Sequence, residues 1–519
     1  MMELKPLPIG IQDFRKIIQG GFLYVDKTRY LYELIRYPAG VYFLSRPRRF
    51  GKSVLISTLD EIFQGNRELF KGLWLYDSPY QWQPHPVIRV DFSRNQVKSA
   101  QELKDVLIWM LNRIAQQFGL TLSGDLYTQR FEDLIEQLSV QSQVAILVDE
   151  YDKPLLDNIE NLEEARRILE VLKGFYTVIK AMDAHVRFVL LTGVSKFSRV
   201  GVFSGLNNLN DITTDGQYAA LLGITQEEVD ACFADYLEGF ASEKGLAAAE
   251  LREQIRFWYN GFRFSEREVT VYNPFSLLLL FQKRKFQNYW FESGTPTFLL
   301  KLLKQQDYNL QTLERLDIPE LAFSTYEIEK LDIVPLLFQT GYLTIKGYDS
   351  VFQTYTLSYP NYEVRRAFLA YLLTTYSSVD LSMAGSSLKQ LARALLNADW
   401  PRFFEVLNSL LASISYELHI KQEKYYQTIF YLIFKLIGLE IQAEARTNQG
   451  RMDAVIETGE AVYIFEFKLS GSAAEALAQI ENRAYFAPYL SKGKPLHLLG
   501  VNFEMASREV TAWQAARRN

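Results

Sequence analysis

The sequence of 519 residues predicts a multidomain α/β protein, and three observations support this. Short apolar runs rich in β-branched residues alternate with long helical stretches over residues 1–215, a pattern typical of a parallel sheet covered by helices on both faces. A second alternation of strands and helices occupies residues 381–519. Hydrophobic residues make up 48% of the chain and charged residues 23%, as in globular proteins. A chain of this length forms about three or four domains.

The first domain is expected at 1–215, followed by a helical lid at 216–292. We expect strands at 40–47, 87–93, 144–150 and 187–194, separated by helices at 53–64, 99–118, 128–139 and 162–182. In the lid, Asn260-Gly261 stands between aromatic runs, which predicts a β-hairpin.

A linker domain is expected at 293–380. A helix that stops at Gly341 precedes two short strands there, which resembles a winged-helix element; a generic α+β linker is the alternative reading. The last domain, 381–519, is expected to have an α/β fold. Its predicted elements are strands at 438–446, 451–457, 461–468 and 495–502 and a helix at 473–488.

Composition excludes several classes of site. The single cysteine, Cys232, excludes disulfide frameworks and cysteine-rich zinc sites and fits a reducing cytoplasm. None of the four histidines pairs at zinc-hydrolase spacing. The N-terminus lacks a signal-peptide pattern, and the apolar run 428–441 is too short for a membrane span. We therefore expect a cytoplasmic protein without membrane contact. A net charge of −5 leaves nucleic-acid contact to local patches.

The loop after the first predicted strand has most features of a phosphate-binding loop. The segment from Arg46 runs Arg-Pro-Arg-Arg-Phe-Gly-Lys-Ser and ends at Ser53, where a helix is expected. Lys52 would reach the β- and γ-phosphates of a nucleotide, and Ser53 would bind Mg²⁺. We include Arg49 and Gly51 among the nucleotide-binding residues. Arg46 stands where such loops usually have their first glycine, a position that usually needs backbone freedom.

An acidic pair, Asp149-Glu150, ends the third predicted strand. An ionised pair at the end of a buried strand is costly unless it meets a cation or a partner. We expect Asp149 to hold Mg²⁺ and Glu150 to polarise the attacking water, the catalytic role in ATP hydrolysis. A surface acidic pair is the alternative. Thr192, at the end of the next strand, is a candidate γ-phosphate sensor, and Arg199 a candidate arginine finger.

Five motifs in order along the chain strengthen this interpretation: Tyr24-Val-Asp26-Lys27-Thr28, Arg46 to Ser53, Val148-Asp-Glu-Tyr-Asp152-Lys-Pro154, Leu191-Thr-Gly-Val-Ser195-Lys-Phe and Trp258-Tyr-Asn-Gly261. Together they resemble the bacterial AAA-ATPase-like family, over essentially the whole chain. Members of that family often carry a C-terminal PD-(D/E)XK nuclease-superfamily domain, and their phosphate-binding loop is similar in lacking the first glycine. The resemblance implies a P-loop NTPase fold that binds ATP and Mg²⁺.

A second cluster of charged residues lies in the C-terminal segment. If the predicted hairpin turns at Gly459-Glu460, Asp453 lies opposite Glu466, on one face of the sheet, with Cβ atoms about 4.5–5.5 Å apart. Lys468 shares that face. Facing carboxylates repel unless a cation lies between them. The pattern predicts a phosphodiesterase site in which Asp453 and Glu466 bind Mg²⁺ or Mn²⁺ and Lys468 orients water.

A register slip of one residue would move Asp453 to the other face, and a solvent-facing charged hairpin is the alternative. Asp453, Glu466 and Lys468 match the PD-(D/E)XK motif residue for residue, and the resemblance implies a mixed sheet flanked by helices. Glu423 and Gln479 stand where such domains often carry accessory residues. Glu423 would extend the metal shell and Gln479 would contact phosphate or metal, although both also fit as solvated helix residues.

Three functions follow as hypotheses. The favoured one is an ATP-regulated, Mg²⁺-dependent DNA nuclease, with foreign or mobile DNA as a reasonable substrate and with oligomer formation compatible with the motifs. The catalytic residues would be Glu150 for ATP, and Asp453, Glu466 and Lys468 for DNA. The alternative is an ATP-driven nucleic-acid-binding or signalling switch that does not cleave. A nucleotide-binding enzyme of small-molecule metabolism would need a ligand pocket that the sequence does not locate.

Overall fold

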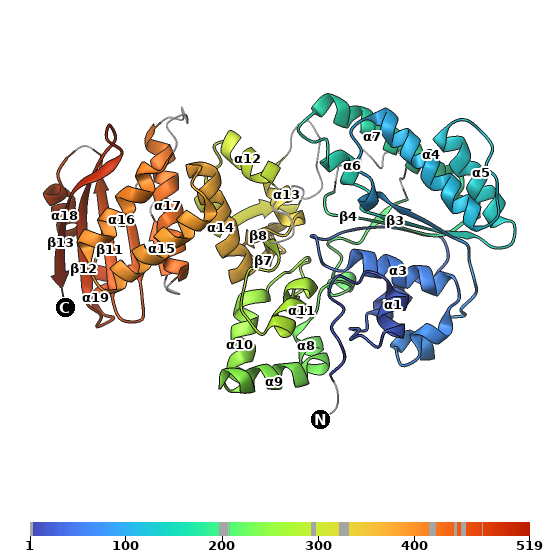
Figure 1. Cartoon of the computed structure of the whole chain (residues 1–519), viewed down its shortest axis with the longest axis horizontal. Helices are drawn as coiled ribbons and strands as arrows, with labels where there is room; N and C mark the ends of the chain where they lie inside the picture. Colours follow the sequence, from blue (N-terminus) through green and yellow to red (C-terminus); the bar gives the residue numbers. More distant parts are fainter. Residues whose placement is uncertain are drawn as a thin grey trace. The chain divides into compact units, whose positions relative to one another are not determined.

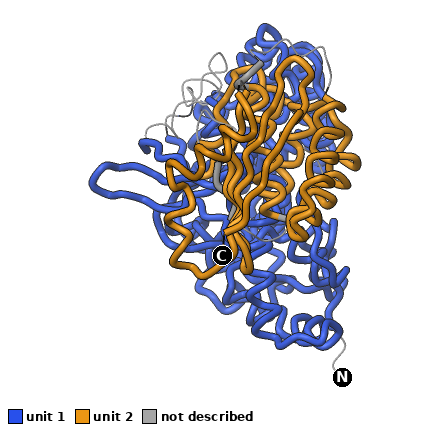
Figure 2. Tube along the Cα trace, turned by 90° about the vertical axis from the view of Figure 1, so that its left-hand side faces the viewer, with its two compact units in different colours: residues 1–295, 315–363 blue, residues 296–314, 364–519 orange. Residues whose placement is uncertain are grey.

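The computed structural model describes residues 4–196, 206, 208–291, 297–320, 332–414, 422–440, 444–447, 453–469 and 471–518. The chain divides into two compact units (Figure 2). Unit 1 comprises residues 1–295 and 315–363, and unit 2 comprises residues 296–314 and 364–519. The chain therefore passes between the units three times.

Unit 1 is built on a parallel five-stranded sheet with the strand order β2-β3-β4-β1-β5. Its strands are β1 (Gly40–Ser45), β2 (Val87–Asp91), β3 (Val144–Asp149), β4 (Val186–Gly193) and β5 (Asn210–Asp211). The predicted α/β fold and its first four strands are confirmed. Because β4 lies between β1 and β3, the carboxyl ends of these three strands meet at one edge of the sheet.

Helices cover both faces of this sheet. Figure 1 shows α1 and α3 on one side and α4, α5 and α7 on the other. The bounds are α1 (Phe14–Gln19), α2 (Thr28–Ile35), α3 (Lys52–Phe63), α4 (Ala100–Gln117), α5 (Tyr127–Ser139), α6 (Lys153–Leu156) and α7 (Leu162–Ala181). Each helix buries its apolar face. On α5, for example, the buried side chains recur at helical spacing: Phe131, Leu134, Ile135 and Leu138.

A helical lid follows the sheet, with α8 (Gln226–Cys232), α9 (Ala234–Lys244), α10 (Ala248–Tyr259) and α11 (Pro274–Lys283). The hairpin predicted at Asn260-Gly261 is wrong. Tyr259 ends α10, where it continues a buried helical stripe with Leu251 and Ile255. Gly261 then turns the chain with a φ of 115°. A Cβ at this position would lie 2.2 Å from the Pro360 carbonyl oxygen, so only glycine fits. Helical spacing therefore outweighs the local turn signal.

The last part of unit 1 has a three-stranded antiparallel sheet, order β6-β8-β7, next to helix α13. The elements are β6 (Leu316–Pro319), α13 (Ile333–Gln339), β7 (Thr344–Asp349) and β8 (Thr354–Ser358). The predicted helix and two strands are present, and β6 is a strand that the sequence did not indicate. The name winged helix stays a prediction.

Unit 2 holds a mixed five-stranded sheet, order β13-β12-β11-β10-β9, in which β11 and β12 are parallel. Its strands are β9 (Glu444–Thr447), β10 (Ala454–Glu457), β11 (Val462–Lys468), β12 (Leu496–Glu504) and β13 (Glu509–Arg518). Its helices are α12 (Thr297–Gln305), α14 (Tyr362–Ser377, which begins in unit 1), α15 (Leu381–Leu396), α16 (Trp400–Ala412), α17 (Gln422–Glu440), α18 (Ala473–Asn482) and α19 (Ala487–Leu490).

Three expectations for unit 2 need correction. The predicted strand 438–446 begins inside α17, because a fully buried apolar run fits a helix as well as a strand. The predicted helix 473–488 is two helices, separated at Ala484, which has a φ of 49°. Strand β13 was not predicted, because most of its residues are exposed and it lacks a clean alternation.

The segment 297–314 is fastened into unit 2 although 49 residues of unit 1 follow it. The Lys304 Nζ donates to the Thr375 carbonyl at 2.7 Å. Arg365 pairs with Glu314 at 2.7 Å, and the Tyr431 hydroxyl donates to the same carboxylate at 3.2 Å. None of the helices that the structure describes is both long and apolar enough to cross a membrane.

Candidate nucleotide and metal sites

The phosphate-binding loop occupies residues 46–51, between β1 and α3. Positive φ angles occur at Arg49 (65°) and at Gly51 (94°), the residue that caps α3. The glycine that this loop requires for its backbone is thus Gly51. The first turn of α3 begins at Lys52, so its free N–H groups lie where phosphate oxygens would bind.

Arg46 takes a structural role at the position of the usual first glycine. Its guanidinium is buried and donates to the Thr213 carbonyl at 2.7 Å and to its neighbour's carbonyl, Ser45, at 2.9 Å. It also lies over the Phe264 ring, 4.3 Å from the centroid. Burial lowers the pKa of Arg46 to about 9. Where other such loops have a flexible glycine, this loop has a cation that connects it to Thr213 and Phe264, both of which follow the sheet in sequence.

Lys52 is buried, and its ammonium group is held by the loop itself. Nζ donates to the carbonyls of Arg46 at 2.9 Å and of Pro47 at 3.0 Å. Burial lowers the pKa of Lys52, and the charges of Asp149 and Glu150 oppose that shift. The positive charge of Lys52 suits a phosphate group. To bind a phosphate, the ammonium group must give up its hydrogen bonds to the two loop carbonyls.

The acidic end of β3 lies beside this loop. Asp149 is 2% exposed and accepts a hydrogen bond of 2.9 Å from the Thr192 hydroxyl of β4. Glu150 has a φ of 54° and faces the cavity described below; burial raises its pKa, and Lys52 opposes the rise. The structure thus brings the predicted residues Lys52, Asp149, Glu150 and Thr192 to one edge of the sheet.

Asp152, to which the sequence assigned no role, holds the loop after β4. Its buried carboxylate accepts from the Val194 N–H at 3.0 Å, and from the Ser195 N–H and hydroxyl, both at 2.6 Å. The Tyr151 hydroxyl donates to the Ser195 carbonyl at 2.9 Å. Residues 192–195 are therefore fixed relative to Asp149. The motif Val148 to Pro154 contained Asp152, but only the structure shows what it binds.

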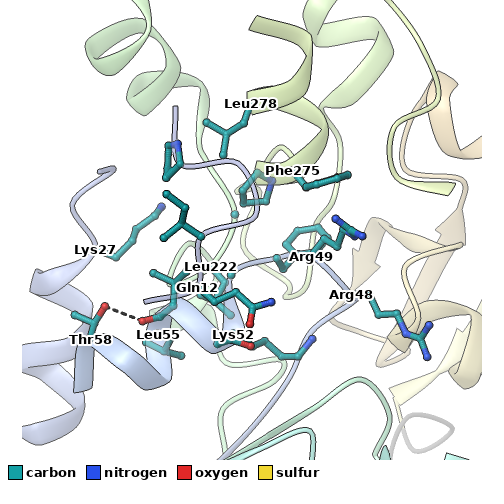
Figure 3. Close-up of a pocket in the computed structure, with 18 of the residues that line it drawn as sticks. Gln12, Lys27, Arg48, Arg49, Lys52, Leu55, Thr58, Leu222, Phe275 and Leu278 are labelled. Carbon is teal, nitrogen blue, oxygen red and sulfur yellow. Dashed lines mark hydrogen bonds between the residues drawn. The ribbon is translucent and has the colours of Figure 1, made fainter. Parts of the chain in front are cut away.

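A cavity of about 740 Å³ opens over the phosphate-binding loop. Its charged and polar wall includes Arg49, Gly51, Lys52, Ser53 and Glu150. Its apolar wall comes from the N-terminal segment and the lid, and the sequence did not identify these residues: Pro8, Ile9, Ile11, Leu23, Val25, Phe275 and Leu278. Figure 3 shows Lys52, Arg49, Phe275 and Leu278 around this space. The Arg49 guanidinium lies over the Phe275 ring, 3.8 Å from its centroid. A polar end and an apolar end suit a nucleotide.

The predicted pairing of β10 with β11 is confirmed. Ala454 lies opposite Phe465 and Glu457 opposite Val462, so Asp453, one residue before β10, falls opposite Glu466. The other face carries the core, where Phe465 stacks on Phe403 of α16 and Phe467 packs on Phe430 of α17. Asp453 and Glu466 are 6% and 2% exposed.

The two carboxylates form a buried pair in which one oxygen of each lacks a donor. Among the residues that the structure describes, none donates a hydrogen bond to the Asp453 Oδ2 or to the Glu466 Oε2 atom. Burial, and next the charge of Asp453, raises the pKa of Glu466 to about 7. Buried carboxylate oxygens without donors fit a divalent cation, which prefers oxygen ligands. Among the described residues, no third acidic, His or Cys side chain joins this pair to complete a group of three metal ligands.

Lys468 and Gln479 complete the site on the same face. The Lys468 Nζ lies 3.6 Å from the Glu466 Oε1 and donates to the Gln479 side-chain oxygen, while the Gln479 amide donates to Glu466. Gln479 comes from α18, which approaches the sheet at Gly500. A Cβ at Gly500 would lie 2.2 Å from the Ala473 carbonyl oxygen of α18. Gly500 is the neighbour of Glu466 on β12.

Glu423 belongs to α17, but its side chain lies outside the described residues, and so does Arg199.

Comparisons with known proteins identify the families of the domains that contain the two candidate sites. Residues 8–203 match the model of a predicted AAA-ATPase family, and residues 421–513 match the PD-(D/E)XK nuclease superfamily. An uncharacterized protein in the vnfD 5′ region of Azotobacter chroococcum is 41% identical over 525 residues, covering 99% of each chain.

A solved structure, the signal transduction ATPase with numerous domains that carries a tetratricopeptide-repeat sensor from Pyrococcus horikoshii, is 13% identical with a TM-score of 0.23. That match covers 84% of this chain and 59% of the other. The chain belongs to the same family as the Azotobacter protein, the AAA-ATPase-like proteins with a C-terminal PD-(D/E)XK nuclease-superfamily domain.

Proposed function

We propose that this protein is a metal-dependent DNA nuclease whose cleavage is regulated by ATP. The observation that carries the proposal is the buried pair Asp453 and Glu466, in which one oxygen of each lacks a donor within the described part of the chain while Lys468 stands beside them. Such a pair is unfavourable in a protein without a cation. A structural hairpin would have no need of it.

In the proposed cleavage step, Asp453 and Glu466 would hold Mg²⁺ or Mn²⁺. The bound ion would neutralise charge on the scissile phosphate and acidify a water molecule. Glu466 must be ionised to bind it. Lys468, tied to Gln479, is placed to orient the attacking water and to stabilise negative charge that develops on the phosphate. Gln479 keeps the lysine beside the carboxylate rather than in solvent.

In the proposed ATP step, the base would lie against the apolar wall formed by the N-terminal segment and α11, and the phosphates against Gly51 to Ser53. Lys52 would exchange its two loop carbonyls for the β- and γ-phosphates. Asp149 and Ser53 would hold Mg²⁺. Glu150 would orient water for attack, because its side chain faces the cavity beside the loop.

The proposed regulation starts at α13 and the turn after it, which contact the loop after β4 and the phosphate-binding loop. The Gln339 side chain accepts a hydrogen bond of 2.7 Å from the Lys196 N–H, next to the loop held by Asp152. Two residues after α13 ends, Gly341 packs on Pro47 so closely that a Cβ would lie 2.8 Å from the proline ring. The carbonyl of Pro47 is also one of the two that accept hydrogen bonds from Lys52. Nucleotide binding that draws Lys52 away from the Pro47 carbonyl would therefore act on the residue that packs against the turn after α13.

The decisive experiment measures cleavage of supercoiled and linear DNA, and of RNA, with Mg²⁺ or Mn²⁺, with and without ATP. The full chain is compared with Lys468→Ala and with Lys389→Ala, a matched exposed lysine of unit 2. We expect metal-dependent cutting that Lys468→Ala loses by at least roughly a hundredfold and Lys389→Ala keeps. Gln339→Ala should keep ATP hydrolysis and weaken the ATP effect on cutting.

If no nucleic acid is cut under any metal while ATP hydrolysis is intact, the nuclease proposal fails. The protein would then be an ATP-driven switch that binds without cleaving.

A further inference from the structure

The tip of the β7–β8 hairpin exposes two adjacent apolar side chains. Val351 is 82% exposed and Phe352 is 76% exposed. Two hydrogen bonds hold the turn, because the Asp349 carboxylate accepts from the N–H of Val351 at 2.9 Å and of Phe352 at 3.0 Å. We call Val351 and Phe352 the knob. A preformed turn that presents apolar side chains to water is the shape of a contact element rather than of a frayed loop.

The surroundings of the knob are acidic. The Tyr348 hydroxyl donates to Glu320 at 3.3 Å, and Glu266 and Asp349 lie close enough to raise the pKa of Tyr348, after the larger effect of burial. Acidic side chains repel the phosphates of nucleic acid and attract a basic protein surface. The knob therefore suits a partner that offers an apolar hollow edged by arginine.

Unit 1 itself offers such a hollow at the free edge of its large sheet, where β2 is the last strand. This hollow, which we call the pocket, has a volume of about 470 Å³, within the range of pockets that hold small ligands. Its apolar wall includes Trp109 (51% exposed) and Phe118 (45% exposed), with Met110 and Ile114 beneath. Exposed aromatic side chains of this kind are enriched in protein interfaces.

Arginines edge the pocket. Arg89 lies 3.7 Å from Asp60, and Arg94 lies 3.0 Å from Asp91, so these two largely balance carboxylates of their own chain. Arg113 is exposed and lies over the Trp109 ring, 5.3 Å from its centroid. It is the arginine best placed to meet an acidic group from outside. The pocket is thus complementary to the knob in both polarity and charge.

The knob and the pocket lie on different sides of unit 1: Figure 1 shows α4 far from β7 and β8. A knob cannot enter the pocket of its own chain. We propose that the knob of one copy inserts into the pocket of a second copy, giving a head-to-tail assembly of this protein. Such a contact is heterologous, so it continues from copy to copy until a ring closes or a filament forms. A knob of two side chains buries little area, which implies concentration-dependent association.

The test uses two full-length variants, Phe352→Asp and Trp109→Glu, with Val140→Asp as control. Val140 is also 82% exposed and belongs to neither surface. Mass is measured by sedimentation over a range of concentrations, and folding by circular dichroism. We expect the wild type and the control to assemble, and each variant to weaken association roughly thirtyfold or more.

The equimolar mixture of the two variants distinguishes the proposal from general loss of structure. Phe352→Asp keeps an intact pocket and Trp109→Glu keeps an intact knob, so the mixture should form a heterodimer that does not grow further. A wild type that stays monomeric, or a mixture without heterodimer when the wild type assembles, overturns the proposal. Loss of nucleic-acid binding in Trp109→Glu with unchanged assembly also overturns it and reassigns the pocket to nucleic acid.

Discussion

Single side chains decide what both sites can do, and Glu466 shows this most directly. Its pKa of about 7 lies above the ordinary carboxyl value, so in the metal-free site the proton is lost only as the pH rises through neutrality. A cation competes with that proton. Metal affinity should therefore rise with pH up to about 7 and level off above it, which titration calorimetry at several pH values would measure.

The same pKa predicts the stability of Glu466→Gln. A raised carboxyl pKa favours the folded state at low pH, and that contribution is lost as pH rises from the ordinary value of 4.5 to about 7. The amide imitates the protonated form. At pH 8 in EDTA the variant should melt about 2 °C or more above the wild type, while Mg²⁺ should stabilise only the wild type. Glu460→Gln, in the exposed turn, is the control; equal shifts in both variants would contradict the assignment.

Arg46 gives a second prediction at this scale, because replacing it with the glycine usual in such loops should lower both ATP turnover and stability. Arg46→Gly leaves the Thr213 carbonyl without its donor in a buried place, at a cost of about 1–3 kcal/mol, and removes the contact with Phe264. ATP turnover and melting temperature should both fall. Arg46→Lys should lie between, since an ammonium group cannot bridge and stack as a guanidinium does. A variant Arg46→Gly with normal turnover would refute this.

At the scale of elements, the sequence predicted well wherever a local pattern agreed with its surroundings. The strands of the large sheet were found because buried parallel strands are continuous apolar runs, and the register of β10 with β11 because a two-residue turn fixes it. The failures have the opposite cause. The end of α17, the strand β13 and the role of Asp152 depend on packing between segments far apart in the chain. The apolar wall of the cavity over the phosphate-binding loop likewise joins residues 8–11 to α11, which no local pattern links.

The approach of α18 to β12 can be tested at Gly500. A methyl group there would meet two backbone atoms of α18 within 2.4 Å, so Gly500→Ala must push the helix outward and move Gln479 away from Glu466. We expect a loss of about 1–3 kcal/mol in unfolding free energy and reduced cleavage, with ATP hydrolysis unchanged. Gly459→Ala, where a Cβ has open space, should change neither. Urea unfolding and the cleavage assay measure the two effects.

At the scale of the whole molecule, the division of the chain matters most. A fragment 364–519 lacks Lys304 and Glu314, the residues that hold α14 and α17 to segment 297–314. We expect this fragment to melt well below unit 2 of the intact protein. Addition of a peptide 296–314 should raise its melting temperature, and the same peptide with Glu314→Ala should raise it less. A fragment as stable as the intact unit would show that the segment is dispensable.

This threading of the chain also bears on inheritance. A nuclease appended at the end of an ATPase gene can be lost, gained or exchanged by one recombination event. Here part of unit 2 is encoded ahead of the last 49 residues of unit 1, so a single crossover between distant relatives would join halves that were not selected together. The two units are thereby expected to descend as one gene, and related genomes should rarely carry unit 1 with a foreign C-terminal unit behind it.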